Sequence, residues 1–423
     1  MAALDGNGLV SALAPLLGPV RIDGLNRLSG GASRETWSFD AIGADGSRTA
    51  LVLRRDPPGR PGERGAMLRE AAAITAAAAA GLAVPEVLLV SDDPDAFGTA
   101  GMVMRRVAGE TIARRILRDD AYAGARGVLA AELGRFAAGL HALQAPAGFP
   151  APDPLAGLRD QLDSFGQPST VFELAMAELL ASPPRAREPV LVHGDLRLGN
   201  LIVGAAGLQA VLDWELTHAG NPAEDLGWLC VKAWRFGAAG PVAGVGSREE
   251  LLAAYRDAGG ADISLDELRW WEILGTLRWG VICLTQAAAH LSGTYRSVEL
   301  AAIGRRVCEQ EWDLLLLLQP EAAAAAAARR PRPSGAATAE PAPHGRPTAS
   351  ELLEAVREFL TDQVMPATSG QLAFHARVAA NTLAIVAREL ELGPLPADVG
   401  LADAVAARLA AANPRYFEVS AQP

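Results

Sequence analysis

The chain has 423 residues, half of them hydrophobic, and a formal net charge of −11. This length allows two or three domains with sizeable cores, so wholesale disorder is excluded. The negative charge argues against a general nucleic-acid binder, which needs a positive surface to displace counterions from phosphates.

The three cysteines, Cys230, Cys283 and Cys308, are widely spaced and form no CxxC pair. This pattern predicts free thiols in a reducing cytosol rather than a zinc site or a disulfide framework. The N-terminal segment contains Asp5 and no basic stretch, which argues against a secretory signal. Because no apolar run is long and uninterrupted enough to span a bilayer, we expect a cytoplasmic protein without membrane association.

Residues 1–107 are rich in strand patterns. The segment GLNRLSGGASRETWSFDA predicts two strands around a Gly-Gly turn, and TALVLRRD predicts a third strand. A helix is expected over GAMLREAAAITAAAAAG, where Gly81 ends it. PEVLLVS and GMVMRRV then predict a hairpin.

Residues 108–320 are mostly helical in pattern, with two short apolar runs at LVHGDLRLGN and AVLDWE. Residues 321–345 are rich in Ala and Pro and predict a flexible linker, although the Ala run also allows an extension of the preceding helix. Residues 346–423 return to helical periodicity, with Thr348 or Ser350 as N-cap and a stop at Gly393-Pro394. The fold class is therefore expected to be α+β: a small β-rich lobe, a larger α-helical lobe, and a small all-α C-terminal domain.

The two apolar runs end in residues suited to phosphoryl transfer. This reaction needs a carboxylate for the acceptor hydroxyl and oxygen ligands for Mg²⁺. Asp195 can accept the hydroxyl proton, while Asn200 and Asp213 can hold the metal. The spacing from Asp195 to Asp213 accommodates a loop and two strands joined at Gly204–Gly207. Asp and Asn are also common turn residues, so each alone would be a weak signal.

HGDLRLGN followed by LDWE resembles the aminoglycoside-phosphotransferase-like and choline-kinase-like branch of the protein-kinase fold. The resemblance covers roughly residues 20–318 and is strongest to phosphotransferases associated with acyl-CoA dehydrogenases. It implies a bilobal kinase-like fold with ATP and Mg²⁺ as cofactors. It also implies that Asp225 supports the catalytic loop. His193 is expected to be structural, bonded to backbone near that loop.

The resemblance extends upstream to a nucleotide loop and a phosphate-pairing cation. The residues expected to offer backbone N–H groups to phosphates are Gly30, Gly31 and Ser33. Arg54 stands where the family usually has lysine, while Arg55 points the other way along the strand. Arginine stays charged and can chelate phosphate oxygens, so the role can survive the substitution. Glu70 is the expected partner of Arg54, and a solvated position on its helix is the competing interpretation.

The family builds its acceptor pocket in the helical lobe. The residues of this chain that can line it are Trp234, Arg235, Arg278 and Trp279. Tryptophans at helical spacing are more often core residues. Glu215 could contact metal or substrate, or only accept a hydrogen bond behind them, and His141 is expected to serve helix packing.

These features predict a Mg·ATP-dependent kinase that phosphorylates a small-molecule hydroxyl. The resemblance favours a hydroxyacyl-CoA or hydroxy acid as acceptor and an acyl-CoA dehydrogenase as partner, with the C-terminal domain as a docking or regulatory module. An aminoglycoside-type antibiotic phosphotransferase is the alternative substrate class. A non-catalytic nucleotide-binding scaffold is the alternative from a different functional class.

Overall fold

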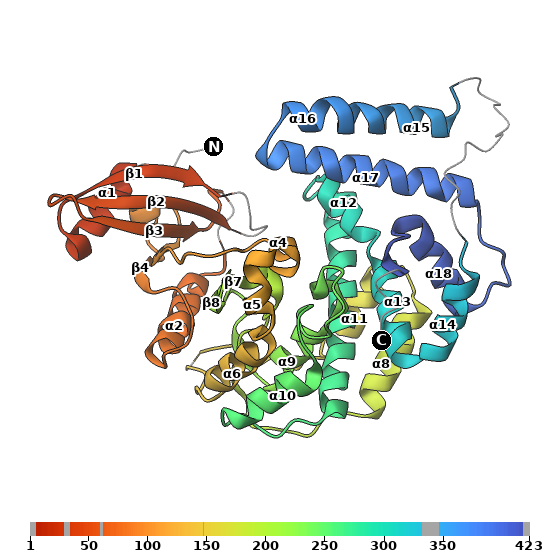
Figure 1. The fold of residues 1–423 in the computed structure, drawn as a ribbon, viewed down its shortest axis with the longest axis horizontal. Helices are drawn as coiled ribbons and strands as arrows, with labels where there is room; N and C mark the ends of the chain where they lie inside the picture. Colours follow the sequence, from red (N-terminus) through yellow and green to blue (C-terminus); the bar gives the residue numbers. More distant parts are fainter. Residues whose placement is uncertain (1–5, 29–33, 60–61, 147, 332–346, 418–423) are drawn as a thin grey trace. The chain divides into compact units, whose positions relative to one another are not determined.

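Five strands near the amino terminus pair into one antiparallel sheet in the order β1-β2-β3-β5-β4. They are β1 (Val20–Arg27), β2 (Glu35–Gly43), β3 (Arg48–Arg55), β4 (Val87–Ser91) and β5 (Gly101–Arg105). The computed structural model describes residues 6–28, 34–59, 62–146, 148–331 and 347–417 (Figure 1). All five strands were expected from the sequence, and the predicted α+β class is confirmed.

Alternation along β3 separates two chemical environments. Leu51 and Leu53 are fully buried in a cluster with Leu9 and Leu13 of the helix α1 (Gly6–Leu17), which the sequence patterns did not predict. Because successive strand residues point to opposite faces, Arg54 lies on the face away from α1. From that face Arg54 bonds to Glu70 of the helix α2 (Ala66–Ala79).

The chain forms two units by its contacts. The first comprises Met1–Pro152, Arg185–Cys230 and Trp234–Leu268, and the second comprises Asp153–Pro184, Val231–Ala233 and Arg269–Pro423. The remaining helices of the first unit are α3 (Pro94–Phe97), α4 (Ala113–Arg118), η1 (Asp120–Tyr122), α5 (Ala123–Arg126), α6 (Leu129–His141), η2 (Leu198–Asn200), α9 (Ala223–Cys230) and α10 (Arg248–Asp257). The helix η3 (Lys232–Arg235) begins in the second unit and ends in the first.

The two sequence motifs lie beside two short antiparallel strand pairs of the first unit. The strand β6 (Val190–Val192) pairs with β9 (His218–Gly220), and β7 (Leu201–Gly204) pairs with β8 (Gly207–Val211). The expected arrangement of loop, strand, Gly204–Gly207 turn and strand is confirmed. The motif HGDLRLGN therefore spans the connection from β6 to β7, and Asp213 comes two residues after the end of β8.

The second unit is helical throughout its described residues. Its helices are α7 (Leu158–Ser164), α8 (Thr170–Ala181), most of α11 (Leu265–Leu291), α12 (Val298–Gly304), α13 (Val307–Leu318), α14 (Pro320–Arg329), α15 (Ala349–Glu358), η4 (Phe359–Val364), α16 (Met365–Ala367), α17 (Gly370–Leu392) and α18 (Leu401–Ala412). Thr348, rather than Ser350, caps α15 in a capping box with Glu351. Figure 1 shows α15 lying along α17.

Residues 321–329, included in the predicted linker, differ from that expectation. They belong to α14, a separate helix that starts at Pro320 after the break at Gln319. Alanine has the highest helix propensity, and Ala323 and Ala326 are fully buried, so this part of the run packs instead of linking. The helix α18 packs against both α13 and α14.

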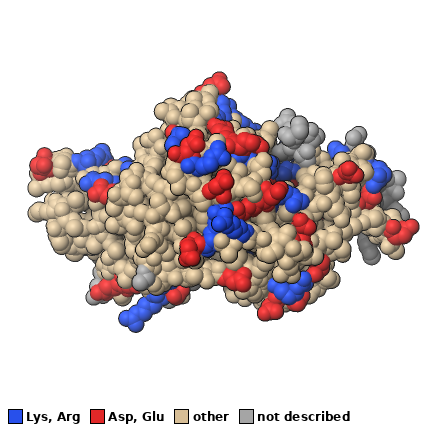
Figure 2. Space-filling view, turned by 90° about the horizontal axis from the view of Figure 1, so that it is seen from below, with Lys and Arg blue, Asp and Glu red and all other residues tan. Residues whose placement is uncertain are grey.

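Charges are mixed over the face drawn in Figure 2, where basic and acidic side chains interleave without a broad patch of one sign. This face therefore offers no basic stripe of the kind that binds a nucleic-acid backbone. Within the described ranges, none of the helices combines the length and the apolar character needed to cross a bilayer.

Candidate active site

The carboxylate of Asp195 is held by three side chains. It accepts hydrogen bonds from Asn200 Nδ2 at 2.6 Å, from Trp228 Nε1 at 2.8 Å and from Arg197 Nε at 2.9 Å. The short helix η2 turns Asn200 back toward the loop, where its Nδ2 also donates to the backbone oxygen of Asp195. Asp195 is thus fixed in one orientation while its side chain stays 13% exposed, as a group that meets a substrate requires.

Asp225, at the start of α9, holds the backbone before Asp195. Its two carboxylate oxygens accept the N–H groups of His193 at 2.7 Å and Gly194 at 2.9 Å, and His141 Nε2 lies 3.2 Å away. The residue is fully buried. Burial disfavours its charged form, but the hydrogen bonds and electrostatic interactions with His141 and His193 outweigh this and lower the pKa of Asp225. Asp225 therefore stays ionised as the clamp of the loop.

His193 is a neutral structural link. Its Nε2 lies 3.0 Å from the carbonyl oxygen of Leu212 and must donate, while Nδ1 accepts the backbone N–H of Asp195 at 3.2 Å. Burial lowers the pKa of His193, although the nearby carboxylates favour its charged form. The ring also packs edge-on against Trp214, with ring centroids 4.8 Å apart. Both ring nitrogens are used, so His193 is unsuited to carrying protons.

The lowered pKa of His193 predicts acid-sensitive folding. The unfolded state binds a proton near pH 6.5 and the folded state does so only at lower pH, so the free energy of unfolding falls as pH drops below 6.5. Urea unfolding between about pH 5 and pH 8 should show this slope in the wild type and a flatter one in His193→Asn. Burial opposes but Glu224 raises the pKa of His218, so His218 makes the free energy of unfolding rise as pH drops. Because wild type and His193→Asn both contain His218, it does not affect the difference between their slopes. Equal slopes would contradict the prediction.

Gly194 occupies the position where the protein-kinase loop has arginine, and its geometry explains the glycine. Its φ is +80°, and a Cβ there would lie 2.5 Å from the carbonyl oxygen of Leu216. Residues other than glycine rarely adopt this backbone conformation, and the backbone of Leu216 fills the space that a side chain would need. No residue with a side chain fits without moving the loop.

Gly194→Ala is therefore expected to reduce both stability and activity. The left-handed conformation alone costs about 1–3 kcal/mol, and a displacement of Asp195 by about 1 Å lowers turnover roughly 100-fold. Gly46→Ala is the matched control, because Gly46 has φ +81° but a Cβ there would meet nothing within 4 Å. The control should lose stability in urea and keep its activity. Equal activity in the two variants would show that the contact with Leu216 is unimportant.

The backbone of Leu212 ties the segment before Asp213 to Asn200. The backbone N–H of Leu212 donates to the carbonyl oxygen of Asn200 at 2.7 Å, and its carbonyl oxygen accepts from His193. Asp213 follows with φ +67°, a conformation shared by few described residues other than glycine. Such strain persists where the surrounding structure fixes it, which is typical of functional sites.

The donor set at this point suits Mg²⁺. Nδ2 of Asn200 is committed to Asp195, which leaves its Oδ1 as an acceptor, and Asp213 is 33% exposed. Among the described residues no cluster of three or more His, Cys, Asp or Glu could enclose a metal ion. Mg²⁺ needs none, because it commonly binds one or two protein oxygens, several waters and substrate phosphates. The residues present therefore fit the ion.

Arg54 links Asp213 to α2. Its Nη1 donates to Glu70 at 2.6 Å and its Nη2 donates to Asp213 at 2.7 Å, while Glu215 lies 4.0 Å away. Arg55 points to the other face of β3 and pairs with Glu35 at 2.8 Å. The guanidinium of Arg54 thus contacts a candidate metal ligand directly.

Arg34 is a second cation at this point, and the sequence patterns did not predict it. It pairs with Glu70 and lies 3.3 Å from Asp56. Burial and the neighbouring Arg54 lower the pKa of Arg34, and nearby carboxylates partly offset this. The signal in the sequence was its place between the glycine pair and β2. The predicted loop residues Gly30, Gly31 and Ser33 lie outside the described residues.

The predicted acceptor residues fall into both units. Trp234 packs against Trp228, with ring centroids 5.3 Å apart, and Trp228 in turn donates to Asp195. Arg235 donates to the carbonyl oxygen of Cys230 at 2.7 Å and ties η3 to the end of α9. Arg278 and Trp279 lie on α11 in the second unit, where Arg306 sits 5.7 Å over the Trp279 ring.

Two further residues at Asp195 were missed in the sequence. Arg197 lies two positions after Asp195 in the motif, and Trp228 lies three positions after Asp225, on the same face of α9. Both spacings were visible, but neither residue type is expected for metal or base chemistry. Only the contacts identify them.

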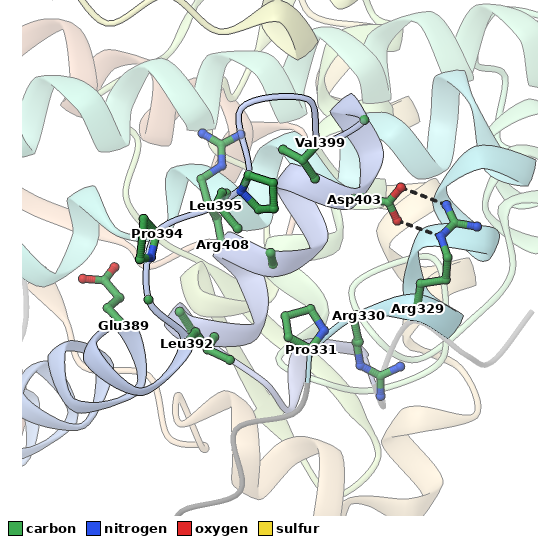
Figure 3. A pocket seen from close by; sticks show the side chains of 15 residues that line it. Arg329, Arg330, Pro331, Glu389, Leu392, Pro394, Leu395, Val399, Asp403 and Arg408 are labelled. Atoms are coloured by element: carbon green, nitrogen blue, oxygen red, sulfur yellow. Dashed lines mark hydrogen bonds and ion pairs between the residues drawn. The ribbon is translucent and has the colours of Figure 1, made fainter. Parts of the chain in front are cut away.

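A hollow of about 680 Å³ lies in the second unit among α14, α18 and the α17–α18 connection (Figure 3). Arg329 and Asp403 pair across its edge at 2.9 Å, and Leu392, Pro394 and Val399 give it an apolar wall. None of the predicted site residues lines this hollow. It is therefore separate from the groups that surround Asp195.

Comparisons with solved structures identify the fold. A Ralstonia eutropha protein assigned as an aminoglycoside phosphotransferase matches 75% of this chain and 99% of its own, with a TM-score of 0.59 and 21% identity. APH(4)-Ia, bound to AMP-PNP and hygromycin B, matches 74% of this chain and 98% of its own, with a TM-score of 0.50 and 16% identity. At these identities the likeness shows the fold alone, and it confirms the expected kinase-like architecture.

Two curated relatives match part of the chain. Acyl-CoA dehydrogenase family member 10 of Mus musculus is 29% identical over 43% of this chain, and member 11 of Gallus gallus is 30% identical over 48%. The matches span only 18% and 27% of those relatives. The chain therefore corresponds to a minor part of each of them.

Family models match both ends of the chain. A domain of unknown function, DUF6285, matches residues 366–403, within the segment of α16, α17 and the start of α18. The model described as "Phosphotransferase enzyme family" matches residues 24–271, which is 248 of the 423 residues. This range holds Asp195, Asn200, Asp213 and Arg54, and the predicted resemblance is confirmed: the chain belongs to the phosphotransferase enzyme family.

Proposed function

We propose that this phosphotransferase is a Mg·ATP-dependent kinase that phosphorylates a hydroxyl group of a small molecule. One observation carries the proposal. The backbone of Leu212 bonds to both Asn200 and His193, and Arg54 bonds to Asp213, so the loop bearing Asp195 meets the candidate metal and phosphate groups. An acceptor carboxylate, oxygen ligands and a phosphate-binding cation are the parts that phosphoryl transfer needs.

Asp195 receives the acceptor. Its fixed carboxylate accepts a hydrogen bond from the substrate hydroxyl and orients the oxygen for in-line attack, then takes the proton as the new bond forms. Asn200 and Trp228 keep its two oxygens in place during this step. Because Asp225 anchors the backbone of His193 and Gly194, the orientation of Asp195 is set before the substrate arrives.

Asn200 and Asp213 would hold Mg²⁺ through their free side-chain oxygens. Once bound, the ion neutralises negative charge on the donor phosphates. Arg54 braces against Glu70 and exchanges its bond to Asp213 for donor phosphate oxygens. ATP as donor is supported by the AMP-PNP complex of APH(4)-Ia. The backbone of Gly30, Gly31 and Ser33 is proposed to cover those phosphates.

A hydroxyacyl-CoA or hydroxy acid is the acceptor we favour, since the two curated relatives carry the name of acyl-CoA dehydrogenases. On the same ground we propose an acyl-CoA dehydrogenase as partner. A cytoplasmic location is proposed from the three free cysteines, which suit a reducing compartment. Trp234, Arg235, Arg278 and Trp279 remain the proposed acceptor-binding residues. Phosphorylation of an aminoglycoside is the second candidate, supported by the hygromycin B bound to APH(4)-Ia.

The experiment is to measure ATP consumption, and phosphate adducts by mass spectrometry, with hydroxy acids, their CoA thioesters and aminoglycosides. We expect one class to give a phosphate adduct, and Asp195→Asn to remove that activity while circular dichroism stays unchanged. Asp45→Asn, in an exposed turn, is the matched control and should stay active. Metal-dependent ATP binding without turnover over the whole panel would favour a non-catalytic scaffold. Equal turnover in Asp195→Asn and wild type would refute the assignment of the base.

A further inference from the structure

Arg197 is held against the catalytic carboxylate by its inner nitrogen. Nε lies 2.9 Å from Oδ1 and 3.1 Å from Oδ2 of Asp195. A guanidinium that pairs through Nε keeps its two terminal nitrogens for other acceptors. Within the described part of the chain, neither terminal nitrogen donates a hydrogen bond, and the side chain is 24% exposed.

The guanidinium has one well-defined place. It lies over the ring of Trp234, with its carbon 4.7 Å from the ring centroid. On another side it approaches Gly199 so closely that a Cβ there would be 2.3 Å from Nη1. A side chain at this motif position would require the guanidinium to shift from its place over Trp234. An arginine packed in this way loses little freedom when it binds a ligand.

Arg197 lies among different neighbours from the cations of the phosphate side. Arg54 and Arg34 come from the sheet and meet at Glu70, whereas Arg197 contacts Trp234, which itself packs on Trp228. Trp228 and Trp234 are 7% and 6% exposed, so this side of Asp195 is walled by aromatic rings. A cation beside such apolar walls is suited to an acceptor that is part apolar and carries oxygen at one end.

We propose that Arg197 determines acceptor specificity by binding the acyl oxygens of a hydroxyacyl substrate while Asp195 binds its hydroxyl. The inference rests on the proposed kinase activity and narrows its acceptor class. Both a free carboxylate and a thioester carbonyl present such oxygens, and the charged carboxylate forms the stronger bond. The guanidinium is fixed to Asp195, so the acyl oxygens lie only a short carbon chain from the hydroxyl that reacts.

The same arrangement disfavours aminoglycosides. Their ammonium groups would have to approach the terminal nitrogens of the Arg197 guanidinium, and like charges at short range repel in a partly desolvated site. A site for polycationic sugars is better served by unpaired carboxylates.

The test compares Arg197→Gln and Arg197→Lys with wild type in steady-state kinetics. The acceptors are 2-, 3- and 4-hydroxybutanoate, their CoA thioesters, and the corresponding alcohols that lack the acyl group. We expect Arg197→Gln to raise KM for the acyl-bearing acceptor about 10- to 100-fold, as the loss of a hydrogen bond to a charged group does. KM for ATP and KM for the plain alcohols should stay within about 2-fold of wild type. Because Arg197 also helps to hold Asp195, kcat is expected to fall for every acceptor, and the selective rise of KM for the acyl-bearing acceptors is the readout. Arg197→Lys retains the positive charge but not the paired terminal nitrogens, so its KM for the acyl-bearing acceptor should lie between those of wild type and Arg197→Gln.

The outcomes separate the two proposals. A variant that lowers kcat equally for every acceptor at unchanged KM would place Arg197 on the transferred phosphoryl group and overturn the inference. If the wild type turns over none of these acceptors, the kinase assignment fails for this class. Calorimetric titration of hydroxybutanoates and thioesters then still tests Arg197, since equal affinity in wild type and Arg197→Gln, or no binding to either, overturns its role. Arg48→Gln, at an arginine 60% exposed at the far end of β3, is the matched control and should match wild type.

Discussion

Asp225→Ala should unfold more easily than wild type by about 3–5 kcal/mol and lose nearly all phosphotransferase activity. The wild-type carboxylate is fully buried and accepts hydrogen bonds from the backbone N–H groups of His193 and Gly194 and from the ring of His141. Removing one partner of a buried charged network leaves the others unsatisfied, which costs about this amount. Urea unfolding and turnover of the identified acceptor check the two effects.

Asp225→Asn is the graded companion of that variant. The amide keeps the shape and one accepting oxygen, so one of the two backbone N–H groups remains bonded. We expect a stability loss between wild type and Asp225→Ala, and a partial loss of turnover. If Asp225→Ala unfolds at the wild-type urea concentration, the carboxylate is not the clamp of the loop.

Removal of the chain beyond Leu318 should destabilise the second unit by more than about 5 kcal/mol, because it removes the buried packing of α14 and α18 against α13 together with the partners of three carboxylates of α13. Glu309, Glu311 and Asp313 are each no more than 5% exposed. Their partners beyond Leu318 are Asn413 at 3.0 Å, Arg408 at 2.9 Å and Tyr416 at 2.7 Å. The shortened protein should be insoluble or unfold without a cooperative transition.

Single substitutions grade this effect. Tyr416→Phe removes one hydrogen bond to Asp313, but the ion pair of Asp313 with Lys232, the chain's one lysine, remains at 3.1 Å. The substitution should therefore lower the free energy of unfolding by about 1–3 kcal/mol. Glu354→Gln on the surface of α15 is the control and should cost less than about 1 kcal/mol. A protein ending at Leu318 that unfolds cooperatively at the full-length midpoint would show that the C-terminal helices are dispensable for folding.

This expectation bears on the role of the C-terminal segment. Its last helix, α18, supplies Val405 and Leu409, both fully buried, to the packing with α13 and α14. The helices α15 and α17 and the η4 segment between them instead expose large apolar side chains, including Leu352, Phe359 and Leu372. The segment thus combines a structural part with a surface whose role as docking or regulatory module stays a prediction.

Local patterns in the sequence were sufficient for the β-rich start, the two ladders around HGDLRLGN and the helices of the tail. Period-two alternation also placed Arg54, not Arg55, on the face toward α2, since that depends only on strand geometry. The motifs named Asp195, Asn200 and Asp213 because few residue types suit a base and Mg²⁺ ligands. The helix α1 and the separate start of α14 were not predicted, because segments of small residues with weak periodicity give little sequence signal for a helix.

Tertiary structure alone decided which groups surround those residues. Glu70 is shared by Arg34 and Arg54, and the carboxylate of Asp195 receives Trp228 from another helix and Arg197 from its own loop. Such contacts join positions many residues apart, and their existence depends on the packing of whole elements rather than on any local spacing. The sequence by itself therefore determined the reaction class expected of this protein, whereas the charged and aromatic side chains around Asp195 followed only from the fold.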